Sequence, residues 1–466
     1  MLFFQPFLSD NALVVAEQQK TNKDMEKSQT NRGKEALKKK GGIAQESKKL
    51  FDSNLRSAES GDTTAMFKVG LCYENGEVVK KDEVKAFQWF MKSAEGDNAD
   101  GMLKVGFCFE NGFGVEQDHA KAYEWYLKSA NHGNVSAMHS VGMCYFSGQG
   151  AAQNKKKGFE WCFKAANGSL SAMFVVAMCY ENGEGVQRDK EKAFKWFLKA
   201  AEKGDANAMF FVASHFDYEK DEKKAFEWYL KAANKGNDFA MVHVASCYFD
   251  GRGVTQDDEK AFQWYLKSAT TYNESVLNRI GFCFETGKGV KKNLAKAYEW
   301  YLKAANSDNV SAMLKVGCFY ESGSGVSQDR TKAFQWFMKS AEGDNADGMF
   351  KVGFCFENGF GVEQDHAKAY EWYLKSVEHG NVSAMHSVGM CYFSGQGVAQ
   401  DKKKGFEWCL KSANKGFVDA MNTVACCFYD GVGVAKDLKR AREWFVKAAQ
   451  NGSEDAKENL DLFDDE

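Results

Sequence analysis

Three things are scarce in this chain of 466 residues, and each scarcity excludes a class of structure. The single proline is Pro6, so no proline interrupts a helix in the rest of the chain. The N-terminus begins MLFFQPFL and continues to ALVVA, and neither segment reaches the ~20 apolar residues of a membrane-spanning helix. The net charge is only −3, which gives no general attraction to nucleic acid or anionic membranes. We therefore expect a cytoplasmic chain without membrane insertion; the alternative is an unusual signal sequence and the lumen of the endoplasmic reticulum.

Tryptophan, in contrast, recurs with a fixed period. Successive tryptophans are 36 residues apart except for one step of 35 and one of 32. The eleven positions are Trp89, Trp125, Trp161, Trp196, Trp228, Trp264, Trp300, Trp336, Trp372, Trp408 and Trp444. A methionine or leucine column, from Met66 to Met421, keeps the same period. A period in this range predicts an array of repeated supersecondary units.

One block of the array is itself duplicated. The stretch KAFQWFMKSAEGDNADGM at Lys85–Met102 recurs letter for letter at Lys332–Met349, 247 residues later. The near-identity continues to about Asn167 and about Asn414. A modular array tolerates such a duplication because each unit contacts mainly its neighbours.

Each unit reads as two helices. In the first unit, Met66, Val69, Gly70 and Tyr73 form one apolar stripe of a first helix. A small residue at the Gly70 place recurs in every unit, which predicts close approach by a second helix. A loop such as NGFGV follows, with glycines suited to positive φ. The fifth unit, with HFDYEKDEKKAF, lacks this loop.

An Asp or Asn in every unit predicts where the second helix begins, because these side chains accept hydrogen bonds from the free N–H groups of a first turn. The predicted N-caps are Asp82, Asp118, Asn154, Asp189, Asp221, Asp257, Asn293, Asp329, Asp365, Asp401 and Asp437. The resulting fold class is all-α: a solenoid of about eleven helix-hairpin repeats with half-repeat caps. We assign residues 1–40 to a disordered polar arm, 41–62 to an N-terminal capping helix, 63–452 to the repeats and 453–466 to a degenerate acidic cap.

These columns resemble those of the Sel-one-like repeat (SLR) family, a relative of the tetratricopeptide repeat. The segment AMHSVGMCYFSGQGVAQDKKKGFEWCLKSANKG carries its A-x-x-x-L-G-x-x-Y, G-x-G-V and D-x-x-K-A-x-x-W-x-x-K-A-A pattern. The resemblance covers about residues 57–452. It implies a right-handed superhelical α-solenoid with the first helices lining the concave side, and a role as adaptor or scaffold for other proteins. Some members act in endoplasmic-reticulum-associated degradation.

Residues with catalytic or metal-binding potential form no site. Nine of the thirteen cysteines share one column of the first helix, which favours small apolar core residues in a reducing compartment. No pair of cysteines has metal-ligand spacing, and the histidines form no recurrent constellation with a nucleophile. The G-x-G loops follow a helix and lack the spacing of a phosphate-binding loop. We expect no enzyme activity, no cofactor and no metal.

A second stripe on the first helices is the candidate partner-binding site. We name its residues the first-helix face. Its first column contains Phe67, Leu103, His139, Phe174, Phe210, Leu314, Phe350 and His386. Its second column contains Leu71, Phe107, Met143, Met178, Phe282, Phe354 and Met390. Its third column contains Glu74, Glu110, Glu181, Glu285, Glu321 and Glu357. Packing between neighbouring units is the alternative use of the apolar columns.

An apolar floor with an acidic edge suits an amphipathic or basic peptide of a partner protein. The leading hypothesis is therefore a protein-interaction scaffold, and a luminal adaptor in protein degradation is a variant of it. Asn134, Asn309 and Asn381 lie in glycosylation sequons that distinguish the two compartments. A nucleic-acid-reading array is disfavoured, because the acidic column repels phosphates. The sequence does not name the partner or the oligomeric state.

Overall fold

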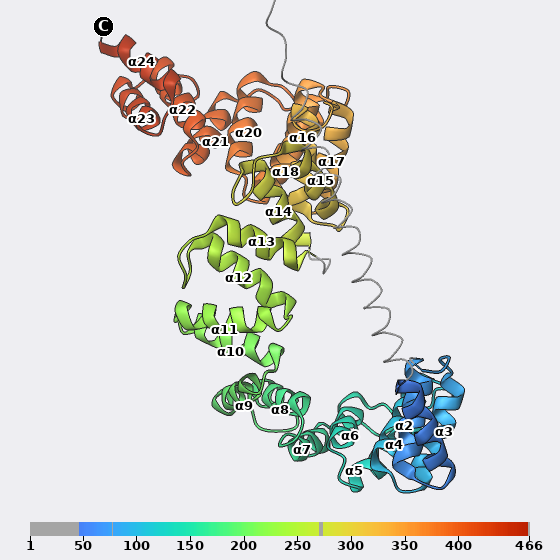
Figure 1. The fold of residues 1–466 in the computed structure, drawn as a ribbon. Helices are drawn as coiled ribbons and strands as arrows, with labels where there is room; N and C mark the ends of the chain where they lie inside the picture. Colours follow the sequence, from blue (N-terminus) through green and yellow to red (C-terminus); the bar gives the residue numbers. More distant parts are fainter. Residues whose placement is uncertain (1–45, 77, 270–273, 465–466) are drawn as a thin grey trace, which may run out of the picture. The chain divides into compact units, whose positions relative to one another are not determined.

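The computed structural model describes residues 46–76, 78–269 and 274–464, and in these ranges every regular element is a helix, with no strand (Figure 1). The predicted polar arm at residues 1–40 lies outside the described residues, as do residues 41–45 of the predicted N-terminal cap. The chain divides into two compact units, of which the first ends at Val212 and the second begins at Ala213. This boundary lies inside one helix, α10 (Ala206–Tyr218).

The first unit begins with a helix over residues 46–59 and continues as a series of helical hairpins. Its further helices are α2 (Thr63–Asn75), α3 (Glu83–Glu95), α4 (Ala99–Asn111), α5 (His119–Asn131), α6 (Val135–Ser147), α7 (Lys155–Ala165), α8 (Leu170–Asn182) and α9 (Lys190–Glu202). Consecutive helices from α2 to α9 pack on each other in sequence order.

The second unit has the same architecture. Its helices after α10 are α11 (Glu222–Asn234), α12 (Asp238–Asp250), α13 (Asp258–Ser268), α14 (Glu274–Thr286), α15 (Leu294–Ala305), α16 (Val310–Ser322), α17 (Arg330–Glu342), α18 (Ala346–Asn358), α19 (His366–Glu378), α20 (Val382–Ser394), α21 (Lys402–Asn414), α22 (Val418–Asp430), α23 (Leu438–Gln450) and α24 (Glu454–Asp464). Helices α11 to α24 again pack in sequence order. The all-α solenoid predicted from the tryptophan period is thereby confirmed.

The local signals in the sequence fix where the helices begin. Each of the eleven predicted Asp or Asn residues is the N-cap of a second helix; Asp118, for example, accepts from the backbone N–H of Lys121 at 3.0 Å. The Lys121 ammonium returns to the Asp118 carboxylate at 3.2 Å and lies over the ring of Phe109 on the preceding helix. One short motif thus starts the second helix and fastens it to the first.

The small residue of the first helix marks the closest approach within a hairpin. A Cβ added at Gly106 would collide with the ring of Tyr126, which is 2% exposed. The loss of helix propensity at this glycine is therefore offset by packing of a large ring against bare backbone. Each tryptophan of the second helices carries a lysine three residues later, with the ammonium 4.1–4.7 Å from the ring centroid.

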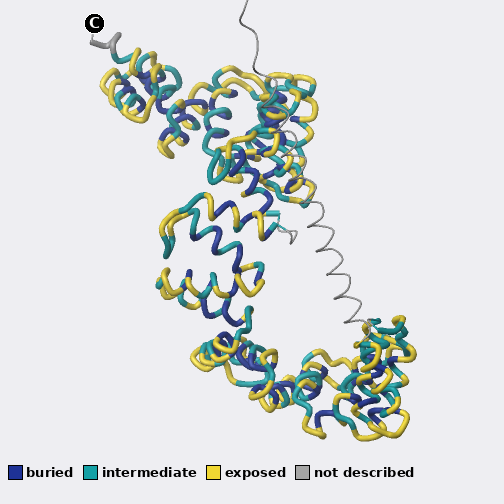
Figure 2. Tube along the Cα trace, viewed as in Figure 1, coloured by how far each residue is buried: buried dark blue, intermediate teal, exposed yellow. Residues whose placement is uncertain are grey.

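The core is a continuous apolar layer within each unit, and Figure 2 shows the buried residues inside the paired helices. Val105 and Val141 of successive first helices are fully buried, and so is Val352 in the second unit. At the N-terminal end, Ala58 in the helix over residues 46–59 is 1% exposed. At the C-terminal end, α24 packs on α23 and buries Ala456. The assignment of these two end helices as caps stays a prediction.

Candidate interaction face

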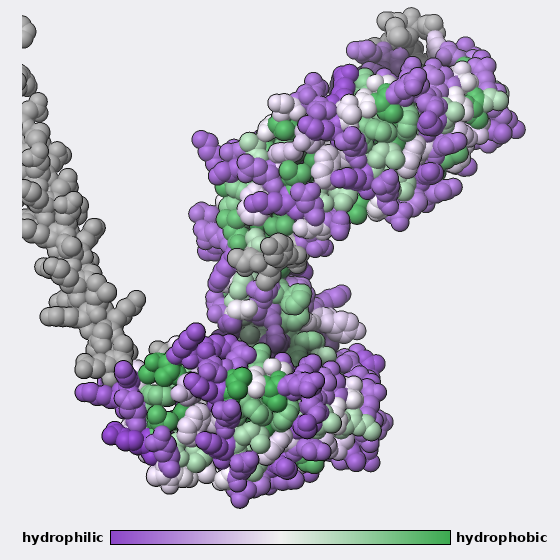
Figure 3. Space-filling model, turned by 90° about the vertical axis from the view of Figure 1, so that its right-hand side faces the viewer, coloured by the Kyte–Doolittle hydropathy of each residue, from purple (hydrophilic) through white to green (hydrophobic). Residues whose placement is uncertain are grey.

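The predicted face lies on the first helices and is distinct from the core. None of its 21 residues is buried, whereas the core valines one or two residues away are 0% exposed. Phe107, Met143 and Met390, all of the second column, are the most exposed, at 38%, 42% and 43%. Figure 3 shows apolar atoms gathered in patches within a mostly hydrophilic surface. The second column therefore offers apolar side chains that the hairpins do not bury.

The first column is shared between packing and surface. The ring of Phe67 lies 5.9 Å from the ring of Phe90, and that of Phe350 lies 5.6 Å from Tyr373. Phe174 contacts both Phe197 and Phe211 in the same way. These residues are half-buried, so one edge of each ring packs on a second helix while the other remains open. The contacts of Phe67 and Phe350 lie within a hairpin, and that of Phe174 with Phe211 joins two repeats. Packing also uses part of the second column, since Phe282 contacts Phe249 of the preceding repeat.

Three glutamates of the third column form ion pairs with the next repeat. A lysine 30 residues later reaches each carboxylate: Lys104 to Glu74 and Lys351 to Glu321, each at 2.7 Å. Both partners of each pair are about one-quarter to one-third exposed. The third pair joins Lys315 and Glu285 at 3.1 Å. These carboxylates are therefore already neutralised, and they hold successive first helices together.

Two other glutamates of the third column have a neutral tyrosine hydroxyl, and no cation, as their partner among the described residues. Glu110 accepts a hydrogen bond from the hydroxyl of Tyr126 at 2.6 Å, and Glu357 accepts from Tyr373 at 2.8 Å. Neither carboxylate forms an ion pair with another described residue. Burial, and the adjacent carboxylate, raise the pKa of both tyrosines, so they act only as neutral donors. A net negative charge remains at Glu110 and Glu357.

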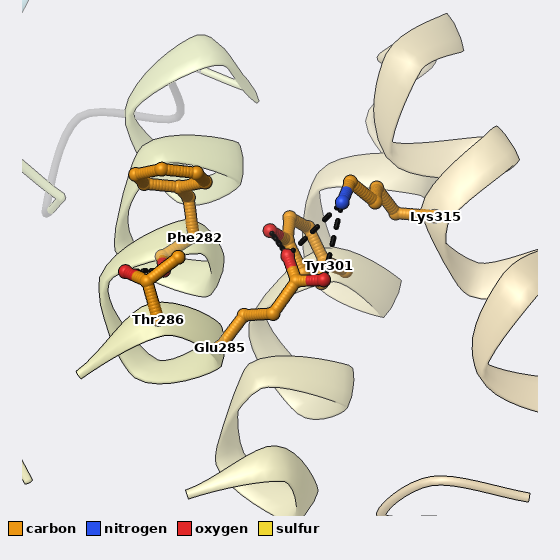
Figure 4. A network of polar contacts seen from close by, with 5 residues as sticks. All are labelled: Phe282, Glu285, Thr286, Tyr301 and Lys315. Carbon is orange, nitrogen blue, oxygen red and sulfur yellow. Dashed lines mark hydrogen bonds and ion pairs between the residues drawn. The ribbon is translucent and has the colours of Figure 1, made fainter. Parts of the chain in front are cut away.

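Glu285 combines both arrangements. Figure 4 shows its carboxylate between the hydroxyl of Tyr301, which donates at 2.5 Å, and the ammonium of Lys315. Phe282 of the second column lies one turn earlier on the same helix, beside Thr286, whose hydroxyl donates to the Phe282 carbonyl at 2.8 Å. Glu181 is held differently, with the Arg188 guanidinium at 3.6 Å.

The two histidines of the first column differ, although they are copies of one duplicated block. His386 Nε2 lies 2.9 Å from the hydroxyl oxygen of Thr423 in the next repeat. The residue in the place of Thr423 in the first copy is Val175, and the buried Nδ1 of His139 has no hydrogen-bond partner among the described residues. Burial lowers the pKa of both imidazoles below the ordinary value of 6.5.

The third column is aromatic in four units, at Phe146, Phe249, Phe393 and Tyr429, and in two of them a glycine on the second helix makes room for the ring. Phe146 packs over Gly158, where nearly every other unit has alanine, and Phe393 packs over Gly405 in the same way. The residue after tryptophan is cysteine in both units instead of tyrosine or phenylalanine. The bulk that the aromatic ring adds on one helix is thus removed from the other.

The structure holds no sign of metal or nucleophile chemistry in its described residues. Within them, no group of three His, Cys, Asp or Glu side chains could hold a metal ion. None of the thirteen cysteines forms a disulfide, and ten are buried. Burial raises the pKa of Cys108 and Cys355 to about 12, so their thiols stay protonated at neutral pH. The described part of the chain also contains no helix with the length and apolarity needed to cross a membrane.

Sequence reasoning missed the lysines and tyrosines that engage the acidic column. The signal was present, because Lys104, Lys315 and Lys351 each follow a third-column glutamate by 30 residues. Only the packed structure shows that this spacing brings the two charges together. It also missed Phe113 and Phe360, which occupy the middle position of two G-x-G loops and line small cavities beside Glu74 and Glu321.

Comparison with known proteins gives one family. The family model described as the Sel1 repeat matches eleven consecutive segments. They are residues 63–98, 99–134, 135–169, 170–205, 206–237, 238–270, 275–309, 310–345, 346–381, 382–417 and 418–453. No curated protein matches the chain in sequence.

Solved structures agree with the family match. A protective antigen present in uropathogenic Escherichia coli strains, described as displaying an SLR fold, is 30% identical, with a TM-score of 0.82. The alignment covers 89% of this chain and 90% of that one. A Sel1 repeat protein from Oxalobacter formigenes is 27% identical over 51% of this chain and 98% of its own, with a TM-score of 0.48.

Proposed function

Because the chain belongs to the Sel1 repeat family, whose members are generally protein-interaction scaffolds, we propose that it is a scaffold for segments of partner proteins. The partner segment lies along the first-helix face, which we expect to be the concave side of the solenoid. One observation carries the proposal: the face repeats from unit to unit, is separate from the core, and leaves Phe107, Met143 and Met390 exposed. Exposed apolar side chains at repeated positions suit a partner that lays down an apolar face of its own.

The charges on the face indicate where basic residues of a partner segment can bind. Glu74, Glu285 and Glu321 are neutralised by lysines, so a basic residue of the partner gains little there. Glu110 and Glu357 have only a neutral tyrosine donor. We therefore expect an amphipathic segment whose apolar residues meet the second column and whose basic residues meet Glu110 or Glu357.

The cysteines support a reducing compartment, and hence the cytoplasm. Thirteen cysteines without a disulfide, of which ten are buried, would be exposed to oxidation during folding in the endoplasmic reticulum. The sequon residues point the same way. Asn134 Oδ1 accepts from the Ala137 N–H at the start of α6, and its Nδ2 donates to Asp100 at 2.8 Å. A glycan on Nδ2 would replace one of the two hydrogens of this nitrogen and would need space beside Asp100. A luminal adaptor remains the alternative, and mass spectrometry for glycans distinguishes the two.

The experiment compares two variants of the full chain. The face variant carries Phe107→Ala, Met143→Ala and Met390→Ala. The control variant carries Leu266→Ala and Leu438→Ala, which remove side chains of similar exposure, 39% and 44%, from second helices. Affinity capture followed by mass spectrometry identifies partners of the wild type, and calorimetry on one purified partner measures affinity.

The face variant is expected to lose at least about tenfold in affinity, since burial of each apolar side chain contributes about 1–2 kcal/mol. The control variant should bind like the wild type. Thermal unfolding followed by circular dichroism verifies that both variants fold. Equal binding by all three chains, with the fold intact, would exclude the face as the binding site. RNA shifted on a gel in a salt-sensitive way would favour the nucleic-acid alternative.

A further inference from the structure

Two equivalent cavities lie at the loop edge of the first-helix face, one in each compact unit. The cavity of the second unit, of about 60 Å³, is lined by Glu321, Arg330, Ala333, Phe337, Cys355 and Phe360. The cavity of the first unit, of about 70 Å³, is lined by Glu74, Lys81, Glu83, Ala86, Phe90, Cys108 and Phe113. Each residue that lines the second cavity lies 247 positions after a residue that lines the first, which is the spacing of the duplication. Lys81 lines only the first cavity.

The apolar walls of the cavities have a local cause. In the units with Tyr126, Tyr301 or Tyr373, a phenol hydroxyl extends to the third-column glutamate. Phe90 and Phe337 stand in the place of these tyrosines and lack the hydroxyl. In the repeats of Phe90 and Phe337, the third-column glutamate forms an ion pair with a lysine of the next repeat, as Glu321 does with Lys351. Space that a hydroxyl occupies elsewhere is therefore open beside Phe90 and Phe337.

A loop phenylalanine forms the outer wall. Phe360 precedes Gly361, which has φ of 74° and passes so close to the Arg330 carbonyl that any Cβ would collide with it. The loop is thus pressed onto the first turn of α17, and the ring of Phe360 is held over the cavity. Phe360 also contacts Phe354 of the second column, with ring centroids 5.8 Å apart. The cavity is therefore continuous with the first-helix face.

The two cavities differ in charge at one rim position. Arg330 has its guanidinium 4.2 Å from the centroid of the Phe360 ring and forms no ion pair with any described residue. The corresponding residue of the first cavity is Glu83, which pairs with Lys81 at 2.8 Å. Since Lys351 neutralises Glu321, the second cavity has a net positive rim. The rim of the first cavity, with Glu74 held by Lys104 and Glu83 held by Lys81, has no unpaired charge.

We propose that the cavity of Phe337, Cys355 and Phe360 is a docking site for a partner segment that inserts one aliphatic side chain and places a neighbouring aspartate or glutamate on Arg330. The proposal rests on the proposed function, because the segment continues along the first-helix face. The apolar walls accept a leucine, isoleucine or valine, and the arginine is fixed by its stacking on Phe360, so it meets a carboxylate already oriented. The first cavity accepts the same aliphatic side chain without preference for an acidic neighbour.

A displayed library of random peptides, panned against the full chain, tests the proposal. Enriched peptides should carry Leu, Ile or Val next to Asp or Glu. One such peptide, labelled with fluorescein, then gives affinities by anisotropy. Arg330→Glu, which introduces the residue found at this position of the first cavity, should weaken binding at least tenfold, and Phe360→Ala should do the same. The matched variant Phe113→Ala should change the affinity less than twofold.

A double-mutant cycle tests the contact itself. Replacing the acidic residue of the peptide with its amide should weaken binding to the wild type, where it removes the partner of Arg330, and should strengthen binding to Arg330→Glu, where it removes the repulsion between two carboxylates. Both side chains changed in the protein are on the surface or in a loop, and circular dichroism verifies the fold.

Several outcomes would overturn the proposal: no enrichment of an aliphatic–acidic pair, an amide peptide that binds equally well, or an equal loss in Phe113→Ala. The triple face variant separates this proposal from the proposed function. If the face variant abolishes binding while Arg330→Glu and Phe360→Ala do not, the scaffold function stands and the docking site is wrong.

Discussion

Tyr126 donates a hydrogen bond of 2.6 Å to Glu110, and so joins the second helix of a repeat to the first helix directly beneath the candidate face. In the preceding repeat the tyrosine is Phe90, and the corresponding Glu74 is held by Lys104 of the next first helix. One glutamate position is therefore satisfied in two ways, once from within the repeat and once from the following repeat.

Tyr126→Phe is expected to destabilise the chain, because it leaves the Glu110 carboxylate without a protein donor. The cost should be about 1 kcal/mol, at the low end for a bond to a charged group, since water reaches this half-buried carboxylate. Ser140 occupies the place of Lys104 in the next repeat, so Tyr126→Phe with Ser140→Lys recreates the arrangement of Glu74. Urea unfolding should show that the double variant recovers most of the loss. Ser140→Lys in the wild type is the control. If the effects of the two single substitutions on the free energy of unfolding simply add in the double variant, the introduced lysine does not replace the Tyr126 hydroxyl as the partner of Glu110.

Gly158→Ala should destabilise the chain even though alanine is the better helix former by about 1 kcal/mol. The added Cβ would lie 3.1 Å from the Phe146 ring and 3.1 Å from the Gly142 carbonyl oxygen. We expect overpacking to cost about 1–3 kcal/mol, which exceeds the gain in propensity. Phe146→Glu in addition restores the combination found in most other repeats and should remove the cost. Thermal unfolding of both variants tests this, and a Gly158→Ala chain more stable than wild type would show that the ring has room to move.

The repeated architecture was predictable because its signals are local and recur in most or all of the eleven repeats. The Asp or Asn caps, the loop glycines and the small residue facing Tyr126 each specify one feature of the hairpin, and the structure places every cap where the sequence puts it. The helical period also separated the face from the core, but left open whether its apolar columns are exposed or used in packing. The 100° offset from the core stripe places Phe107 and Met143 outside the core whatever the curvature of the array.

The electrostatics of the face could not be predicted from the sequence in the same way. The acidic edge of the face reads as a row of free glutamates, yet whether Glu321 is neutral or charged depends on Lys351 in another helix, 30 residues away. The cavity at Phe337 depends on a missing hydroxyl, a loop residue and a glycine from three different segments. Such features arise from the spacing of side chains across helices, which a one-dimensional pattern does not record.

The buried cysteines predict slow chemical labelling and loss of stability in alkali. The ten buried thiols have their pKa raised to about 11 or 12 by burial. At pH 8 an aromatic disulfide reagent should react rapidly with at most the three half-buried thiols, Cys72, Cys318 and Cys426, and with all thirteen in guanidinium. Above pH ~9 the unfolded chain ionises its thiols while the folded chain does not, so stability falls as pH rises toward 12. Rapid reaction of more than three thiols in the native chain would contradict the predicted core.

The paired histidines predict a difference between the two duplicated copies in mild acid. Burial lowers the pKa of His139 and His386, so stability that is present above pH ~6.5 is lost as the pH falls and the unfolded chain takes up protons first. Hydrogen bonds from the backbone lower the pKa of the N-cap carboxylates of Asp82 and Asp118 below 3.8, so these groups do not change their charge between pH 7 and pH 5. Stability lost in this window is therefore assigned to histidine.

Each histidine is tested by a substitution to leucine, which Leu103 and Leu314 already show to fit the column. His139→Leu should raise the free energy of unfolding by about 1 kcal/mol at pH 7, because it removes a buried nitrogen with no hydrogen-bond partner, and by more at pH 5. His386→Leu should give no gain at pH 7, since the bond to Thr423 is lost along with the imidazole. The Thr423 hydroxyl keeps its bond to the Asp419 carbonyl, so no new unsatisfied group confuses the comparison. Urea unfolding of the wild type and both variants at pH 7 and pH 5 gives the change in the free energy of unfolding for each substitution at each pH. Equal changes for the two substitutions at pH 7 would show that Thr423 does not distinguish the copies.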